Sequence, residues 1–318
     1  MKILVTGGAG FIGSHIVDEL IEKGHSVAVV DNLSTGKKEN INDKAKFYKK
    51  DIQSEEISSI IEKENPGVVF HYAAQIDVRK STQDPTKDAK TNILGSLNVI
   101  ESFLDKATNP KHLFFASTGG AIYGEAEQIP TKESYKEEPL SPYGVAKLAV
   151  EKYLKFYNNT HDLKYTSFRF SNVYGPRQNS KGEAGVAAIF TDQILAGEQP
   201  IIFGDGKQTR DFVYVKDVVR ANMIALEKEK EGVYNISTGE ETSVNEIFNY
   251  LKEITGKELP EKHGKAKEGE QRRSCLDYSR AKKELGWKPE YNTKDGLKET
   301  VEWFKNKNWQ KRTYCTTM

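Results

Sequence analysis

Short apolar runs alternate with amphipathic segments of helical periodicity through the first half of the chain. Such runs are typical of β-strands buried on both faces, and the segments between them carry apolar residues every three or four positions. The runs lie at residues 2–6, 27–30, 47–49, 68–71, 113–116 and 165–170, and the most regular helical segments lie at 88–106 and 142–159. This alternation predicts an α/β fold with a Rossmann-type doubly wound parallel sheet, whose strands all end at one edge.

After residue 170 the pattern is less regular. It predicts a helix at 185–196 and a short strand at 201–203, and the run at 233–236 has the character of a strand that rejoins the first sheet. We therefore expect a Rossmann domain made of residues 1–170, rejoined by about 211–240. Residues 171–210 and 241–318 then form a smaller α/β domain that closes a cleft and binds the substrate.

The composition excludes several classes of protein. The chain has 318 residues, a formal net charge of +1 and interleaved lysines and acids, so it carries no basic surface for nucleic acid. Cys275 and Cys315 lie too far apart in sequence to indicate a disulfide framework or a metal site. No apolar run is long enough to cross a membrane, and no signal-peptide pattern precedes the first strand. We expect a cytoplasmic protein with no metal, membrane or nucleic-acid partner.

A glycine-rich turn, Gly7-Gly8-Ala9-Gly10-Phe11-Ile12-Gly13, joins the first predicted strand to the first predicted helix. A turn in this context is where a dinucleotide fingerprint is found. Its glycines let the backbone approach a pyrophosphate, and the helix amino terminus supplies N–H donors and a favourable dipole. We interpret it as a dinucleotide site, although the spacing is Gly-x-x-Gly-x-x-Gly and not the usual Gly-x-Gly-x-x-Gly.

Acidic residues end the next two predicted strands. Asp31 follows the glycine turn at about the distance of 20 residues at which a carboxylate accepts hydrogen bonds from the adenosine ribose. This carboxylate would repel a 2′-phosphate, so NAD is favoured over NADP. Asp51 is placed to reach the adenine amino group, or else is a solvated acid at a strand end.

Tyr143 and Lys147 form a Tyr-x-x-x-Lys motif at the start of the predicted helix at 142–159. Residues four apart share one face of a helix, so the phenol and the ammonium converge on one ligand. The lysine charge favours the phenolate and lowers the pKa of the phenol, which gives a base that removes a proton from a sugar hydroxyl.

A second match to this motif, Tyr278 to Lys282, serves as an internal control. Only Tyr143 follows a Ser-Pro helix start and a preceding apolar strand that ends in Ser117-Thr118. We interpret Tyr278 as structural.

Eight motifs in this order resemble the extended short-chain dehydrogenase/reductase family of NAD-dependent epimerases and dehydratases, and within it the UDP-glucose 4-epimerases. The resemblance covers residues 1–304. The motifs are Thr6 to Gly13, Asp31 to Gly36, His71-Tyr72-Ala73-Ala74, Thr91-Asn92, Ser117-Thr118, the Tyr143/Lys147 pair, Arg169-Phe170-Ser171-Asn172 and Gln208 to Phe212.

The resemblance implies NAD as the cofactor, with Tyr143 as the base, Lys147 as its partner, and either Thr118 or Ser117 bonding the hydroxyl that is oxidised. The segment between this hydroxyl pair and Tyr123-Gly124 is one residue longer than in many members, so the choice stays open. The cofactor residues that the resemblance implies are Gly7, Gly10, Phe11, Ile12, Gly13, Asp31, Asn32, Ser34, Asp51, Ile52, Ala73, Ala74, Gln75, Asn92, Tyr143 and Lys147.

For the substrate, the resemblance implies a UDP-sugar. Asn172 and Arg210 would hold its pyrophosphate, and Ile202 and Phe203 would flank the uracil. The other substrate residues that it implies are Val78, Val186, Lys267 (where many relatives have arginine), Glu270 and Ser274.

The implied reaction is the reversible inversion of C4 of a UDP-hexose through a 4-keto intermediate. Ser274 is small where strict UDP-glucose enzymes tend to have tyrosine, which implies that UDP-N-acetylglucosamine is also accepted. The helices at 88–106 and 142–159 resemble a pair that forms a dimeric four-helix bundle in relatives, which implies a homodimer.

Three alternatives stay open at this point. A nucleotide-sugar 4,6-dehydratase needs an acid/base pair after Thr118, and Gly119-Gly120 supplies none. A UDP-glucuronate epimerase or decarboxylase needs added polar contacts to the sugar carboxylate, which the sequence does not exclude. A binding module that senses NAD without catalysis is disfavoured by the intact Tyr143/Lys147 pair.

Overall fold

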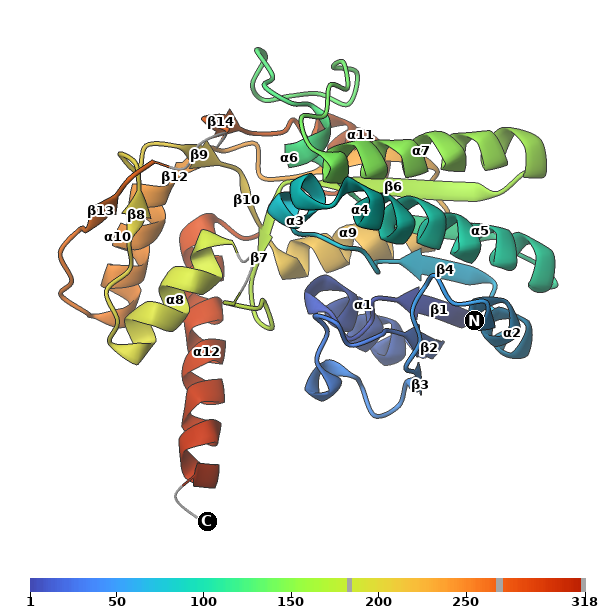
Figure 1. The fold of residues 1–318 in the computed structure, drawn as a ribbon, viewed down its shortest axis with the longest axis horizontal. Coiled ribbons are helices and arrows are strands. Elements are labelled where there is room, and N and C mark those ends of the chain that lie inside the picture. Colours follow the sequence, from blue (N-terminus) through green and yellow to red (C-terminus); the bar gives the residue numbers. More distant parts are fainter. Residues whose placement is uncertain (182–184, 267–270, 316–318) are drawn as a thin grey trace.

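A seven-stranded parallel sheet forms the centre of the molecule (Figure 1). The computed structural model describes residues 1–181, 185–266 and 271–315, with side chains as far as residue 306. The strand order is β11-β6-β5-β4-β1-β2-β3. The strands are β1 (Lys2–Thr6), β2 (Ser26–Val30), β3 (Lys46–Tyr48), β4 (Val68–His71), β5 (His112–Thr118), β6 (Lys164–Phe170) and β11 (Gly232–Ile236). The doubly wound parallel sheet is confirmed, and so is the strand expected at 233–236, because β11 pairs in parallel with β6.

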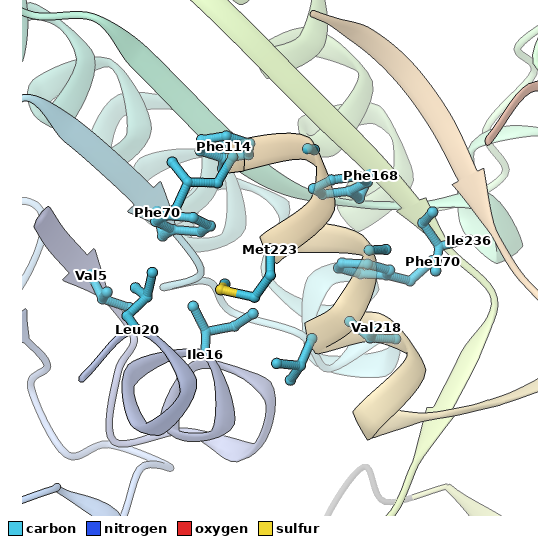
Figure 2. Packing of buried hydrophobic residues seen from close by; sticks show 14 of the residues in the cluster. Val5, Ile16, Leu20, Phe70, Phe114, Phe168, Phe170, Val218, Met223 and Ile236 are labelled. Atoms are coloured by element: carbon cyan, nitrogen blue, oxygen red, sulfur yellow. The ribbon is translucent and has the colours of Figure 1, made fainter. Parts of the chain in front are cut away.

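Helices cover both faces of this sheet. α1 (Phe11–Glu22) and α9 (Val215–Glu227) pack on one face, while α2 (Glu56–Glu64), α5 (Gly95–Lys106) and α7 (Pro142–His161) pack on the other. Successive side chains of a strand point to opposite faces, so near-continuous apolar runs supply both cores. Figure 2 shows the first core, in which Phe70 and Phe114 of adjacent strands stack with ring centroids 4.5 Å apart above the α1 and α9 side chains.

The helix expected at 88–106 is interrupted. It consists of α4 (Pro85–Ala89), one wider π-helical turn, η2 (Lys90–Leu94), and α5. α3 (Val78–Gln83) precedes it and is separated from α4 by Asp84. A π turn inserts an extra residue into a helix and is frequent at functional sites. Here it contains Asn92, one of the predicted cofactor residues.

A further hydrophobic core lies beside the sheet, among α8 (Val186–Ala196), α10 (Val244–Thr255) and α12 (Thr293–Cys315) (Figure 1). Phe190, Phe248 and Leu297 are buried where the three helices meet. Short strands border this core: β7 (Asn172–Tyr174), β8 (Ile202–Phe203), β9 (Thr209–Arg210), β10 (Phe212–Tyr214), β12 (Thr242–Ser243), β13 (His263–Gly264) and β14 (Arg273–Ser274). The remaining helices are η1 (Lys38–Asn40), α6 (Gly119–Ile122) and α11 (Ser279–Leu285). Within the described residues, no helix is long and apolar enough to cross a membrane.

Candidate active site

The glycine turn after β1 is packed tightly against the rest of the chain. Gly7 has a positive φ of 71°, and a Cβ there would lie 2.5 Å from the backbone nitrogen of Ala73. A Cβ on Gly13 would lie 2.2 Å from the carbonyl oxygen of Gly7. These two glycines are therefore required by packing within the protein itself, whereas their expected role was to let a ligand approach.

Gly10 differs from its neighbours. A Cβ at this position would meet only the Gly7 carbonyl oxygen, at 3.1 Å. Gly10 is the N-cap of α1, and no side chain caps this helix end. The first-turn N–H groups and the positive end of the helix dipole are thus left for an anionic ligand, which fits the pyrophosphate of a dinucleotide.

Asp31 ends β2 beside this turn and is buried. Its carboxylate accepts hydrogen bonds from the N–H groups of Ala9, at 3.0 Å, and Leu33, at 2.8 Å, so it holds the glycine turn to the loop after β2. Burial raises the pKa of this carboxyl. Each oxygen keeps a lone pair for a further donor, and a ribose hydroxyl supplies one.

Of the residues predicted to bind the adenosine part of the cofactor, the structure brings some together and places others elsewhere. The Asn32 amide donates to Asp51 Oδ2 at 2.7 Å, and the exposed Ser34 N–H donates to Asn32 Oδ1 at 2.8 Å. Phe11 and Ile12 are half-buried at the start of α1. Ile52, by contrast, is buried in the core between the sheet and α5, so its side chain serves packing.

The loop after β4 carries Ala73, Ala74 and Gln75, and Asn92 of the π turn fastens it. The Gln75 N–H donates to Asn92 Oδ1 at 2.8 Å, and Asn92 Nδ2 donates to the Gln75 carbonyl at 2.9 Å. Asn92 thus fastens the loop after β4, and its role in binding the cofactor stays a prediction. The same amide also donates to Asp88 Oδ1 at 2.9 Å. Asp88 is a buried acid that the sequence analysis missed, since its only signal was its place one turn before Asn92.

Tyr143 and Lys147 lie at the start of α7, which Ser141 caps by accepting from the Gly144 N–H. The Lys147 ammonium donates to the carbonyl of Ala116 in β5 at 2.8 Å and lies 5.9 Å from the centroid of the Tyr143 ring. The convergence expected from the motif is therefore present. Tyr278, in contrast, precedes α11 and packs edge-on against Trp287.

The sequence analysis predicted a lowered pKa for the Tyr143 phenol, but in the protein without ligands this pKa is raised. Burial, reinforced by the charge of Asp88, raises the pKa of Tyr143. Burial lowers the pKa of Lys147 to about 8, and the nearby acids Asp88 and Glu151 oppose this shift. Desolvation is the largest cause of both shifts, and it raises the pKa of the phenol while it lowers the pKa of the ammonium.

Ser117 and Thr118 end β5 and differ in their surroundings. Ser117 is buried, and its Oγ has no hydrogen-bond partner within the described residues. By strand alternation it shares the face of Phe115, over which the Lys147 ammonium lies at 4.7 Å. Thr118 is half-buried and precedes α6.

The predicted substrate residues gather around Asp211, another residue that the sequence analysis missed. The Asn172 N–H donates to the Asp211 carbonyl at 2.9 Å, and the Asp211 N–H donates to the Ser274 carbonyl at 2.9 Å. Ser274 also pairs with Arg210 between β14 and β9. The buried Asp211 carboxylate accepts from Ser171, Thr238, Gly239 and Leu276. It therefore ties the end of the sheet to the strands that carry Asn172, Arg210 and Ser274.

The remaining residues predicted to bind the substrate differ in their exposure. Phe203 is 39 % exposed, so its ring is accessible to a base, but Ile202 is buried in the core beside α8 and α10 and its side chain does not flank a ligand. Val78 is 39 % exposed at the start of α3, and Val186 is half-buried at the start of α8. Lys267 and Glu270 lie outside the described residues.

The comparisons with known proteins agree over nearly the whole chain. The model of the NAD dependent epimerase/dehydratase family matches residues 3–237. A putative UDP-glucose 4-epimerase of Methanocaldococcus jannaschii is 49% identical over 306 residues, which are 96% of this chain and 99% of the relative.

Two solved structures are also similar. The UDP-glucose 4-epimerase of Thermotoga maritima with UDP-glucose has a TM-score of 0.93 and 52% identity, and the match covers 96% of this chain and 99% of the other. The UDP-glucose 4-epimerase of Thermus thermophilus in complex with NAD has a TM-score of 0.91 and 41% identity, with the same coverage.

Proposed function

Since the chain belongs to the NAD-dependent epimerase/dehydratase family, we propose that it is a UDP-glucose 4-epimerase, which reversibly interconverts UDP-glucose and UDP-galactose. The observation that supports the proposal is the Tyr143/Lys147 pair: the Lys147 ammonium lies near the Tyr143 ring and bonds to the carbonyl of Ala116 in β5, the strand that ends in Ser117 and Thr118.

In this reaction Tyr143, as phenolate, removes the proton from the 4-hydroxyl of the sugar. Ser117 or Thr118 hydrogen-bonds the same oxygen, and Lys147 stabilises the phenolate and binds the cofactor ribose. Bound NAD would supply the hydride acceptor for C4, and its positive charge would favour ionisation of the Tyr143 phenol, whose pKa burial raises. The flat 4-keto sugar turns over before the hydride returns, so the configuration at C4 inverts.

The cores on the two faces of the sheet and the separate core beside it support two distinct binding regions. We propose that residues 1–170 and about 211–240 bind NAD, while residues 171–210 and 241–318 bind the UDP-sugar. Asn172 and Arg210 would hold the pyrophosphate, and Phe203 would stack on the uracil. Asp211 bonds to the backbone of Asn172 and Ser274 at the junction of the two regions, and we expect the cofactor and the substrate to meet near it.

We also propose that the enzyme accepts N-acetylated UDP-hexoses. A Cβ on Gly120 would lie 4.0 Å from Ser274 Oγ, so two small residues adjoin next to Thr118. Their small volume would leave space for an acetamido group, which a tyrosine ring would fill.

The exposed apolar side chains on η2 and α7 support a homodimer. Leu94, Val145 and Phe156 are each at least half exposed, and Leu140 just before α7 is 73 % exposed. Apolar groups of this size rarely gather on the surface of a monomer, and we propose that a second copy covers them.

The decisive test is incubation of the NAD-loaded protein with UDP-galactose and detection of UDP-glucose. Tyr143→Phe should reduce turnover by about 100-fold or more, because it removes the base, and should leave NAD binding nearly intact. Tyr278→Phe is the matched control and should retain activity. No UDP-glucose from the wild-type protein would refute the proposed function, and a fully active Tyr143→Phe would reassign the base.

A further inference from the structure

His71, the last residue of β4, is a buried imidazole to which the proposed reaction gives no role. Both of its ring nitrogens have a hydrogen-bond partner: Nδ1 lies 2.7 Å from Thr6 Oγ1, and Nε2 lies 2.8 Å from Ser96 Oγ. Thr6 ends β1 and pairs with His71 in the register of the sheet, while Ser96 is the second residue of α5. The imidazole therefore joins two adjacent strand ends to a helix that covers them.

The direction of each of these hydrogen bonds follows from the number of protons. The Ser96 hydroxyl donates its one proton to the Asn92 carbonyl at 2.6 Å, the bond that a helical serine makes four residues back. Ser96 Oγ then accepts from His71, so Nε2 carries a proton. Burial lowers the pKa of His71 to about 3, so the ring is neutral and Nδ1 accepts from the Thr6 hydroxyl.

At its other end this series of hydrogen bonds reaches the loop after β4. The Ala73 N–H donates to Thr6 Oγ1 at 3.3 Å, so every donor points from the loop towards the π turn. The side chain of Asn92 in that turn bonds back to the loop through the Gln75 backbone. The loop is thus held at two positions by one connected series of buried bonds, and His71 is its central member.

The loop held in this way is in close contact with the glycine turn. A Cβ on Gly7 would lie 2.5 Å from the backbone nitrogen of Ala73, and Thr6, directly before Gly7, bonds to the same nitrogen. A shift of the loop would therefore change the spacing between the two segments that are proposed to bind NAD.

We propose that His71 is a positioning residue of the cofactor site: as the Nε2–H tautomer it links the end of β1 to the π turn and fixes the loop after β4 against the glycine turn. A loop that is ordered before its ligand arrives costs less free energy to bind. The effect on the cofactor rests on the proposed function, while the series of hydrogen bonds does not.

His71→Phe keeps a ring at this position and removes both hydrogen bonds. NAD would then have to order the loop as it binds, so its Kd should rise by about tenfold. The matched control is His112→Phe: His112 is also buried and bonds Thr166 Oγ1 at 2.8 Å, but it begins β5 and lies at the opposite edge of the sheet. The control should lose a similar amount of stability, measured as Tm, and keep the wild-type Kd.

Thr6→Val tests the same series with a smaller change. Valine has the shape of threonine without its hydroxyl, so the substitution removes the bonds to Ala73 and His71. The Kd for NAD should again rise, whereas Thr166→Val, which removes the partner of His112, should leave it unchanged. If each variant changes NAD affinity no more than its control, His71 serves only the packing of the core and the proposal is wrong.

A further measurement needs no cofactor, substrate or activity. In protein labelled with 15N at histidine, the ring shifts distinguish the two neutral tautomers from the imidazolium, and the His71 signals are identified by their change in Thr6→Val. We expect a protonated Nε2 and an unprotonated Nδ1 between about pH 6 and 8. The Nδ1–H tautomer or an imidazolium would overturn the proposal even if the protein binds NAD. A wild-type protein that binds no NAD would refute the proposed function, and the tautomer would then still test the series of hydrogen bonds by itself.

Discussion

Ser274 is buried, and its Oγ would lie 4.0 Å from a Cβ on Gly120, so both neighbours are small. Ser274→Tyr would fill the space proposed for an acetamido group. We expect kcat/KM for UDP-N-acetylglucosamine to fall by about tenfold or more relative to that for UDP-glucose. Ser274→Ala keeps the site small and should leave the ratio of the two substrates unchanged. An unchanged ratio in Ser274→Tyr would show that this residue does not control the sugar.

The roles of individual side chains were also the hardest feature to predict from the sequence. The spacing of a motif predicted that Tyr143 and Lys147 share one face of a helix, while Asn92 was implied only by the family resemblance. Sequence reasoning left Ser117 and Thr118 undecided, since one extra residue before Tyr123 shifts the register. It missed Asp88 and Asp211 because buried acids are recognised by the donors that tertiary contacts bring to them, and those donors come from distant segments.

At the scale of elements, two glycines of the turn before α1 have different expected roles: Gly13 is needed for packing and Gly10 for binding the cofactor. Gly13→Ala would place a Cβ 2.2 Å from a backbone oxygen, which the turn accommodates only by moving. We expect it to lower the free energy of unfolding by about 2 kcal/mol or more. Gly10→Ala meets one atom at 3.1 Å and should cost at most about 1 kcal/mol, yet should weaken NAD binding.

Urea unfolding without cofactor and titration with NAD measure the two effects. Gly67→Ala is the control, since a Cβ there makes contacts no shorter than 4.0 Å and the position is remote from the turn. Equal losses of stability in Gly10→Ala and Gly13→Ala would contradict the separation of roles.

Strands were predicted better than helix detail for a physical reason. Strands buried on both faces are mostly apolar, so β1, β2 and β4 stand out as runs. The π turn at 90–94 escaped prediction because it widens a helix by one residue without breaking the apolar periodicity. The π turn contains Asn92, which fastens the loop after β4, where the resemblance implies that the cofactor binds.

At the scale of the whole molecule, the exposed apolar face of η2 and α7 determines the expected assembly. α4, η2 and α7 lie side by side on one face of the sheet (Figure 1), and a groove between them is lined by Pro85, Ile93, Leu140 and Val145. Helices presented in this way bury their apolar faces by forming a four-helix bundle with a second copy. The face extends along α7 to Phe156, which is 50 % exposed.

Light scattering at micromolar concentration should therefore give about 72 kDa, twice the 35.9 kDa of one chain. Val145→Glu combined with Phe156→Glu places charges in the contact and should yield a monomer that still binds NAD, because neither residue belongs to the cofactor site. Ile201→Glu, at an exposed apolar position next to β8, should remain a dimer. A wild-type mass of about 36 kDa would contradict the dimer, and the apolar face would then require a different partner.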